Sequence, residues 1–512
     1  MKILDCTLRD GGYYTNWDFS QDLVDSYLQA MNLLPVDYIE VGYRNNPSDE
    51  YMGEYAFTPV SVLKHIRSVC HKKLTVMLNE KSTLPDDLDH LLVPIVGLVD
   101  MIRIAVDPKN FNRAVVLAKA IKALGFEVGF NVMYMSKWRT EHSDFISHLN
   151  EIDGIVDLFC MVDSFGGITP EEVEEIYKDV KENTRCTIGF HGHNNLQLGL
   201  INSVTAMKLG VGFVDATILG MGRGAGNLSL ELLLTYLNAH NGLSVDFNIL
   251  GDVISAFTPL YEKHRWGTNL PYMLAGANKI PQKEVMSWVT NRRYSFNSIV
   301  RALNNRKDHS EDNARFPLIQ IDKKYDTVIV VGGGDSATLH SKAIKQFIQK
   351  EQNVALVFAT TRQAHPYNDV SADKYYCLVG NESRRFADIV GNNLSANETC
   401  VLAPYPRLMG TDVPDFAYGK TVELPSVEFT DLYKDSVTSI ALQLALDLSS
   451  KQLFLIGYDG YPGNILSEKE IDLTHENQYL FKKYEHFCQH KPVSLTPTLY
   501  RDLSVNSIYQ LI

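Results

Sequence analysis

Apolar runs of strand length alternate with segments of helix length along the first half of the chain. We expect strands in eight such runs: the one that begins at Ile3, then Val36–Tyr43, Leu74–Asn79, Val99–Val106, Glu127–Tyr134, Val156–Asp163, Thr187–His193 and Phe213–Leu219. Eight strand–helix repeats predict an α/β fold, a (β/α)8 TIM barrel. A doubly wound open sheet is the alternative, but no phosphate-loop glycine motif follows the first run.

Two of the intervening segments carry clear helix signals. Thr169-Pro170-Glu171-Glu172 is a capping box with proline at the first helical position. The alanine- and leucine-rich segment Arg113–Leu124 stops at Gly125, which is typical of a helix C-terminus. Both support the alternation of strands with helices.

The chain is too long for one ordinary domain, and its pattern changes twice after the barrel. We assign residues 1–240 to the barrel and 241–305 to a helical extension of it. The polar stretch Asn304–Ala314 marks a boundary, so residues 306–325 are predicted as a linker. Residues 326–512 then form a smaller Rossmann-like α/β domain. Its expected elements are the strands Thr327–Val331, Val354–Ala359, Tyr375–Val379, Thr399–Ala403 and Leu453–Ile456 and the helix Ser436–Leu448.

Composition narrows the function classes. A formal net charge of −13 argues against nonspecific binding to nucleic acid. No apolar run approaches the length of a membrane span, and the N-terminus lacks the features of a signal peptide. The seven cysteines are scattered, with no CxxC pair. We therefore expect a cytoplasmic protein with reduced cysteines that acts on small molecules, without a membrane or nucleic-acid partner.

Polar residues at three barrel strand ends are candidates for a metal site. Asp10 lies in the polar loop that we expect directly after the first strand, His191 and His193 end the seventh, and Asn227 lies in the glycine-rich segment after the eighth. Strands one, seven and eight are neighbours in a closed barrel, and active sites lie at the carboxyl ends of the strands. One carboxylate, two imidazoles and an amide oxygen suit an octahedral divalent cation, either Mn²⁺ or Mg²⁺, with Co²⁺ and Zn²⁺ as alternatives.

These same segments carry a family resemblance. The stretch Asp5-Cys6-Thr7-Leu8-Arg9-Asp10-Gly11, together with His191-Gly192-His193-Asn194, resembles the DRE-TIM metallolyase superfamily. That superfamily includes 4-hydroxy-2-oxovalerate aldolase, HMG-CoA lyase, isopropylmalate and citramalate synthases and pyruvate-carboxylating enzymes. Secondary matches extend the resemblance over residues 1–300: Ile39-Glu40-Val41-Gly42, Arg103, Asn131, Asp163-Ser164-Phe165-Gly166-Gly167, Gly224-Ala225-Gly226-Asn227 and Glu231.

The resemblance implies a division of roles. Asp10, His191 and His193 would be metal ligands, with Asn227 at or near them, and a 2-oxo acid would chelate the metal, which acts as a Lewis acid. Arg9 would stabilise the enolate oxygen that develops as a C–C bond breaks or forms. Glu40 would orient Arg9. Arg103, Asn131 and Ser164 would bind substrate. For Glu40 and Arg103 a purely structural ion pair in the barrel mouth is the alternative.

One position departs from the aldolase pattern. Aldolases of this superfamily place a histidine base two residues past the glycine of Arg-Asp-Gly, where this chain has Tyr13. Tyrosine is a poor base near neutral pH unless its pKa is lowered. The base is therefore Tyr13, Tyr14, a metal-bound water or a residue of the helical extension such as Tyr272. The acyl-CoA-using members place glutamine there, which this chain also lacks.

The most consistent prediction is an aldolase that forms or cleaves a bond of a 2-oxo acid through a pyruvate enolate, with an aldehyde as partner. One alternative is an acyl-CoA-dependent synthase or lyase in the same barrel. Another is a binding module that keeps its metal without turnover. We also expect a homo-oligomer.

The second domain carries its own glycine motif. Gly332-Gly333-Gly334-Asp335-Ser336-Ala337 follows an apolar strand and precedes a helix. NAD binding is disfavoured because the next strand ends without an acidic residue. The glycine loop and the late segment Leu455-Ile456-Gly457-Tyr458-Asp459 weakly resemble pterin-diphosphokinase-like proteins and related bacterial sialyltransferases. This resemblance implies a nucleotide or nucleotide-sugar at Gly332, Gly334, Ser336 and Asp459, and hence a bifunctional enzyme. The alternative is a glycine turn that serves only as a tight connection.

Overall fold

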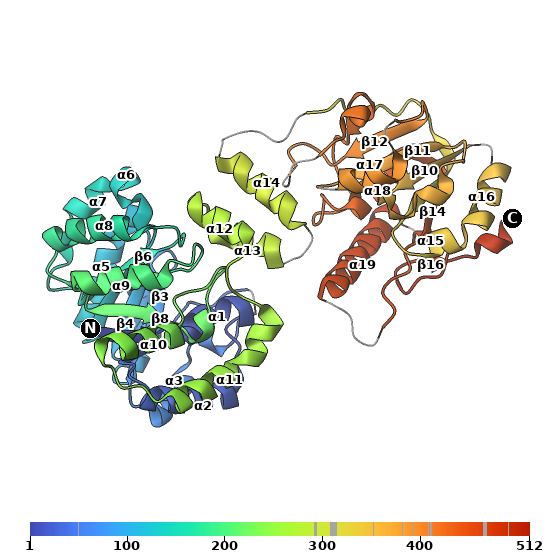
Figure 1. The fold of residues 1–512 in the computed structure, drawn as a ribbon. Helices are drawn as coiled ribbons and strands as arrows, with labels where there is room; N and C mark the ends of the chain where they lie inside the picture. Colours follow the sequence, from blue (N-terminus) through green and yellow to red (C-terminus); the bar gives the residue numbers. More distant parts are fainter. Residues whose placement is uncertain are drawn as a thin grey trace. The chain divides into compact units, whose positions relative to one another are not determined.

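The computed structural model describes every residue except 50, 291–293, 308–314, 352, 381, 392, 408, 410–411, 464–467 and 490. Its first part is a closed barrel of parallel strands in sequential order, as the strand–helix pattern predicts (Figure 1). The strands are β1 (Lys2–Asp5), β2 (Tyr38–Tyr43), β3 (Lys73–Asn79), β4 (Met101–Val106), β5 (Glu127–Val132), β6 (Leu158–Asp163), β7 (Thr187–Gly192) and β8 (Phe213–Ala216). Closure pairs β1 with β8, with Leu4 opposite Asp215.

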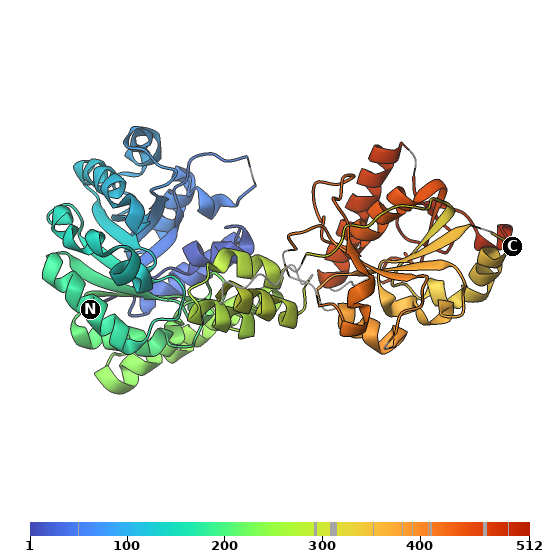
Figure 2. The ribbon, with the colours of Figure 1, turned by 90° about the horizontal axis from the view of Figure 1, so that it is seen from above.

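The barrel strands alternate with helices, and further helices follow the last strand (Figure 2). The helices are α1 (Thr7–Thr15), α2 (Gln21–Leu33), α3 (Val60–Val69), α4 (Leu88–Leu91), α5 (Phe111–Ala123), α6 (Trp138–Glu141), α7 (Ser143–Ser147), α8 (Pro170–Asn183), α9 (Gly199–Leu209), α10 (Leu230–Asn241), α11 (Phe247–His264), α12 (Leu270–Ala277) and α13 (Gln282–Thr290). The predicted capping box begins α8: Thr169 accepts from the Glu172 N–H at 3.4 Å, and the Glu172 carboxylate accepts from the Thr169 N–H at 2.9 Å.

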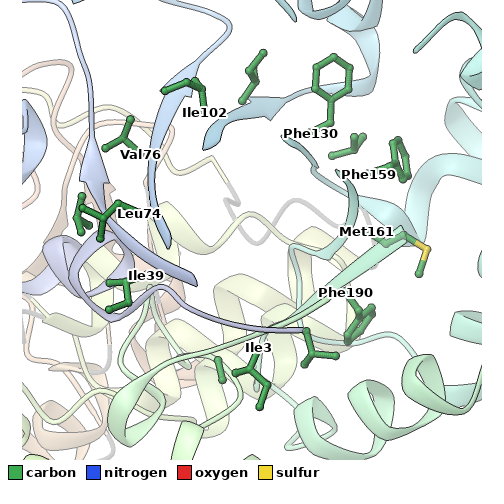
Figure 3. Packing of buried hydrophobic residues seen from close by; sticks show 14 of the residues in the cluster. Ile3, Ile39, Leu74, Val76, Ile102, Phe130, Phe159, Met161 and Phe190 are labelled. Carbon is green, nitrogen blue, oxygen red and sulfur yellow. The ribbon is translucent and has the colours of Figure 1, made fainter. Parts of the chain in front are cut away.

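Alternation along the strands sorts the side chains into an outer and an inner layer. Outward-facing apolar residues pack between strands and helices, as Figure 3 shows for Ile39, Val76 and Phe130. Inside the barrel, a separate small cluster closes the end where the strands begin: Leu4, Tyr38, Met101, Leu158 and Phe213. Its sixth member, Cys6, follows the other end of β1. Two residues further along the strands, the inward positions become polar, and this change places charged groups above an apolar floor.

The segment after β1 differs from the sequence prediction. We expected a polar loop there, but Arg9 and Asp10 lie in helix α1, and both are buried. The two glycines of this helix lack side chains, and neighbouring side chains occupy the space beside them. A Cβ on Gly12 would lie 2.0 Å from the Trp17 ring, and a Cβ on Gly11 would lie 2.6 Å from the Met221 sulfur. The helix therefore fixes Arg9 and Asp10 more rigidly than a loop would.

The second part of the chain is a parallel eight-stranded sheet with helices, an α/β domain as predicted. Its sheet order is β13-β12-β11-β10-β9-β14-β15-β16. The strands are β9 (Tyr325–Val331), β10 (Val354–Phe358), β11 (Asp373–Leu378), β12 (Glu398–Leu402), β13 (Thr421–Glu423), β14 (Ser449–Ile456), β15 (Val493–Ser494) and β16 (Ser504–Val505). The helices are α15 (Ser336–Leu339), α16 (Ser341–Lys350), α17 (Glu382–Val390), α18 (Val437–Leu448) and α19 (Glu468–Cys488).

Both faces of this sheet are covered, and alternate strand residues enter different apolar clusters. Val328 and Val330 of β9 belong to one cluster, and Ile329 and Val331 belong to the other. Strands buried on both faces produce the continuous apolar runs that made them recognisable in the sequence.

The chain divides into two compact units, Met1–Met286 and Ser287–Ile512. This division falls within α13, so helix α14 (Phe296–Lys307) belongs to the second unit rather than to the predicted barrel extension. The assignment of residues 1–240, 241–305, 306–325 and 326–512 to separate parts stays a prediction, and most of the linker's first half, 308–314, lies outside the described residues. Among the described helices, none is both long and apolar enough to cross a bilayer.

Candidate functional site

The polar layer inside the barrel is organised by Arg103, whose side chain is 0% exposed. Its Nε donates to the Asn131 amide oxygen at 2.6 Å, and its Nη2 donates to the Asp215 carboxylate at 2.6 Å. Its Nη1 reaches Glu40 at 3.4 Å. Gly129 leaves room for this side chain, because a Cβ there would lie 3.0 Å from Arg103 Cγ. The predicted ion pair of Arg103 with Glu40 is therefore present, and contact of Arg103 and Asn131 with substrate stays a prediction.

Arg9 lies at the barrel mouth between two carboxylates. Its Nε donates to Glu40 at 2.7 Å, and its Nη1 is paired with Asp10. Burial alone lowers the pKa of Arg9, but Asp10 and Glu40 outweigh it and raise this pKa well above its usual value. The remaining terminal nitrogen, Nη2, makes no hydrogen bond to any residue that the structure describes. Glu40 thus contacts Arg9 as predicted, its orienting role stays a prediction, and one terminal nitrogen of the guanidinium is without a hydrogen bond among the described residues.

The structure brings together the four residues predicted as metal ligands. The Oδ2 atom of Asp10 lies 3.6 Å from His191 Nε2 and accepts from the Asn227 amide at 2.7 Å. The His191 and His193 rings are 5.0 Å apart between centroids. Burial tends to raise the pKa of Asp10, but Arg9 and the two histidines outweigh it and hold this pKa below its usual value.

Both imidazoles are oriented by a partner at Nδ1. His191 Nδ1 lies 2.9 Å from the Asp215 carboxylate, and His193 Nδ1 lies 2.7 Å from the Asp163 carbonyl oxygen. A carbonyl oxygen only accepts, so His193 Nδ1 carries the proton and its Nε2 keeps a free lone pair. Burial, followed by the neighbouring His191, lowers the pKa of His193 to about 3, so this ring stays neutral.

These residues fit a divalent cation. The set offers an ionised carboxylate, imidazole nitrogens with Nδ1 occupied, and an amide oxygen, Asn227 Oδ1, that is buried without a hydrogen-bond partner among the described residues. An orphaned buried acceptor costs free energy unless a donor or cation satisfies it. Nitrogen and oxygen donors of this kind suit Mn²⁺, Mg²⁺, Co²⁺ or Zn²⁺.

A second possible ligand group overlaps this set. Among the described residues, Cys6, His191 and Asp215 are the one group of three His, Cys, Asp or Glu whose ligand atoms all lie within 4.8 Å of one another. However, Asp215 already pairs with Arg103 and His191, and burial raises the pKa of Cys6 well above its usual value. A protonated thiol is a weak ligand, so the Asp10 group is the better donor set.

Tyr13 belongs to a partly exposed aromatic group at the edge of the site. Its hydroxyl lies 3.0 Å from the Tyr43 hydroxyl, and the Arg223 guanidinium lies 3.9 Å from the centre of its ring. The other two tyrosines considered as bases are less suited to the role. Burial raises the pKa of Tyr14 to about 12 and also raises that of Tyr272.

Ser164 lies at the end of β6, where its hydroxyl accepts from the Tyr134 N–H at 2.8 Å. This bond still leaves the hydroxyl hydrogen as a donor. Its predicted contact with a substrate carboxylate therefore stays a prediction.

Three neighbours of the site were missed from the sequence: Asp215, Tyr43 and Arg223. Asp215 was recognisable in principle, because it interrupts the apolar run of β8 at an inward position next to the histidine strand. Tyr43 and Arg223 gave no comparable signal, because neither of them is a polar residue inside an apolar run.

The four residues predicted for the second domain are also brought together. Asp459 accepts from the Ser336 N–H at 2.9 Å and from its hydroxyl, and a Cβ on Gly334 would lie 2.5 Å from Asp459 Cγ. A Cβ on Gly332 would lie 2.5 Å from the Gly457 carbonyl oxygen. Three of them, Gly332, Gly334 and Asp459, line a cavity of about 230 Å³ at the carboxyl ends of β9, β10 and β14. Its other lining residues include Thr360, Arg362, Arg385, Tyr461, Glu476 and Asn477.

Comparison with known proteins gives a consistent picture for the barrel. The family model described as HMGL-like matches residues 98–253. A 4-hydroxy-2-oxovalerate aldolase of Geobacillus thermodenitrificans is 32% identical over 242 residues, which cover 46% of this chain and 69% of the relative. An oxaloacetate decarboxylase of Mycobacterium tuberculosis is 27% identical, over 49% of this chain and 74% of the relative.

Among solved structures, the N-terminal domain of a provisionally assigned aldolase from Bacteroides vulgatus is 70% identical to this chain. The match covers 59% of this chain and 100% of that domain, with a TM-score of 0.57.

Proposed function

This chain belongs to the HMGL-like family, within the DRE-TIM superfamily, and from that membership we propose that its barrel is a metal-dependent aldolase acting on 2-oxo acids. Cleavage of a 4-hydroxy-2-oxo acid and decarboxylation of oxaloacetate both leave pyruvate enolate. The two activities named for the relatives thus share an intermediate, and we propose that this enolate is what the site stabilises.

Asp10, His191, His193 and Asn227 would hold the divalent cation. When bound, the cation would act as a Lewis acid that polarises the 2-oxo carbonyl. The roles of the protein groups follow from their contacts. Asp215 and the Asp163 carbonyl keep both imidazoles in the tautomer that presents Nε2.

The observation that carries the proposal is the arrangement of Arg9. Two carboxylates fix its guanidinium beside the candidate metal ligands, and one terminal nitrogen stays unengaged among the described residues. We propose that this nitrogen donates to the enolate oxygen as charge develops on it. A donor fixed in advance costs little reorganisation during reaction, which is the main source of such stabilisation.

Tyr13 is the proton-transferring group that the geometry favours. Its hydroxyl already exchanges a hydrogen bond with Tyr43, and the Arg223 guanidinium lies 3.9 Å from the centre of its ring. In the cleavage direction, Tyr13 would take the proton from the 4-hydroxyl group, and Tyr43 would keep the phenol oriented.

The test is release of pyruvate from 4-hydroxy-2-oxopentanoate by the full-length protein, with and without a chelator. We expect activity that disappears with chelator and returns with Mn²⁺ or Mg²⁺. Release that is indifferent to chelation would contradict the metal-dependent mechanism. Release of free thiol from acetyl-CoA in the presence of a 2-oxo acid would instead favour the acyl-CoA-dependent alternative.

For the second domain we propose a nucleotide or nucleotide-sugar site at the 230 Å³ cavity. Strands β10 to β13 are added on one side of β9, and the next strand in the chain, β14, is added on its other side. Ligands of open α/β sheets bind where the strand order changes direction in this way. Because Asp459 already occupies the N-terminal N–H of α15, the phosphates would bind to Arg362 and Arg385 instead.

Calorimetric titration of the full-length protein with CMP and UDP tests this site. We expect binding that weakens about tenfold in Arg362→Met, since a charge-assisted hydrogen bond is lost. The exposed Lys491→Met serves as the control. Affinity that is unchanged in Arg362→Met would contradict the proposal.

A further inference from the structure

Three arginines lie around the barrel mouth, and their side chains are engaged differently. Arg9 and Arg103 are buried, and each is paired with two carboxylates. Arg223, in the loop after β8, forms no ion pair and no side-chain hydrogen bond with the residues that the structure describes. Its guanidinium carbon lies over the face of Tyr13, 3.9 Å from the centre of the ring. A guanidinium is always charged and offers a planar fork of donors, so Arg223 has unused capacity to bind an anion.

The position of Arg223 fixes which part of a substrate it can meet. Asp10, His191 and Asn227 are almost fully buried, whereas Tyr13 and Arg223 are partly exposed. The candidate metal ligands therefore form the buried part of the site, and Tyr13 and Arg223 lie together at its partly exposed edge. A substrate whose 2-oxo acid end lies on the ligand group would extend its other end toward Arg223.

Loop geometry holds the arginine in place. Gly224 and Gly226 both have positive φ angles, 63° and 78°, and the Gly224 carbonyl oxygen accepts from the Tyr14 hydroxyl at 2.9 Å. The Gly226 N–H also donates to the carbonyl oxygen of Arg223 at 3.1 Å. The backbone that carries Arg223 is thus fixed on both sides, and its side chain is stacked against the aromatic group.

From this arrangement we infer that Arg223 binds an anionic group, carboxylate or phosphate, on the aldehyde half of the substrate. The enzyme would then select 4-hydroxy-2-oxo acids that carry a negative charge at the end remote from the 2-oxo group. This inference rests on the proposed aldolase function and specifies its second substrate.

A matched pair of unreactive ligands tests the inference by binding alone. 2-Oxoglutarate and 2-oxopentanoate have the same chain length and differ only in a terminal carboxylate in place of a methyl group. In calorimetric titrations of the Mn²⁺-loaded full-length protein, we expect 2-oxoglutarate to bind about tenfold more tightly. Arg223→Met should abolish that preference, and Arg223→Lys should restore part of it, which a purely structural role in supporting Tyr13 would not do.

Arg185→Met is the control, because Arg185 is exposed just before β7, at the opposite end of the barrel. It should keep the wild-type preference. Equal affinity of the wild type for the two ligands would overturn the inference and leave the proposed function standing. Failure to bind either ligand would contradict the proposed function, and the inference would fall with it. Weakened binding of both ligands by Arg223→Met would place Arg223 on the 2-oxo acid end and would also overturn the inference.

A kinetic experiment separates the two anions. Pyruvate would be condensed with glyoxylate, with glycolaldehyde phosphate and with neutral acetaldehyde. We expect one of the two anionic aldehydes to have a KM at least about tenfold below that of acetaldehyde, and Arg223→Met to remove most of that advantage. The favoured aldehyde identifies the group. Acetaldehyde with the lowest KM would contradict the inference.

Discussion

The Asp215 carboxylate accepts from His191 Nδ1 at 2.9 Å, and the same oxygen accepts from Arg103 at 2.6 Å. Asp215 thus connects the innermost arginine of the barrel to the candidate metal site. We expect Asp215→Asn to weaken metal binding by about 10- to 100-fold, because the amide no longer fixes the imidazole tautomer. Calorimetric titration with Mn²⁺ measures this. The exposed Asp252→Asn on α11 should bind Mn²⁺ normally, and equal affinities of the two variants would contradict the orienting role.

Arg9→Ala should separate metal binding from turnover. Loss of one preorganised donor to a developing oxyanion typically lowers kcat by about 10²- to 10³-fold. The metal content should persist, because Asp10, His191, His193 and Asn227 are all retained. Pyruvate release and metal analysis on the same preparation provide the two readouts. A variant that keeps kcat within threefold of wild type would rule out the proposed role of Arg9.

Tyr13→Phe removes the hydroxyl but keeps the ring against which Arg223 stacks. We expect kcat to fall by about 10²-fold or more, as is typical when a general base is lost. Tyr14→Phe is the comparison, because burial holds the pKa of Tyr14 at about 12 and makes it the poorer base. A larger loss of kcat in Tyr14→Phe than in Tyr13→Phe would reverse the assignment.

Asp5 gives the barrel a pH-dependent stability. Burial raises the pKa of this carboxyl from 3.8 to about 6, despite hydrogen bonds from Tyr27 and Thr7. The folded state therefore holds a proton that the unfolded state releases, so stability falls as the pH rises from about 4 to about 6. In Asp5→Asn that part of the pH dependence should be absent.

Tryptophan fluorescence during thermal unfolding follows mainly the barrel, because three of the four tryptophans, Trp17, Trp138 and Trp266, lie in the first compact unit and Trp288 lies in the second. The useful quantity is the difference in apparent Tm between Asp5→Asn and wild type at each pH. This difference should grow in favour of the variant between about pH 4 and pH 6. A difference independent of pH would contradict the prediction.

The strands, and the proximity of the residues predicted as metal ligands, could be predicted from the sequence for one physical reason. Barrel strands are buried, so they appear as apolar runs, and closure of the barrel makes neighbours of residues that lie at strand ends, such as Asp10 and His191. Arg9 was placed in a loop because Gly11 and Gly12 usually end a regular element. The helix instead continues through them, with Gly12 against the Trp17 ring and Gly11 against the Met221 side chain.

Other features depend on side-chain packing that no local pattern encodes. The stacking of Arg223 on Tyr13 joins residues about two hundred positions apart in the sequence, and neither of them belongs to a strand. Likewise, Ser336 and Asp459 are both polar residues beside glycines in the sequence. Their hydrogen bonding to each other, which occupies the N–H that a phosphate would otherwise use, appears only in the folded sheet.

The apolar cluster of Leu4, Tyr38, Met101, Leu158 and Phe213 closes one end of the barrel. Reactants and products of the proposed reaction must then share a single entrance. The part of the substrate bound deepest would be the last to depart, so the aldehyde would leave first and pyruvate second. Ordered release of this kind makes pyruvate a competitive inhibitor of cleavage and the aldehyde a noncompetitive one, a pattern that initial-rate measurements with added products can reveal.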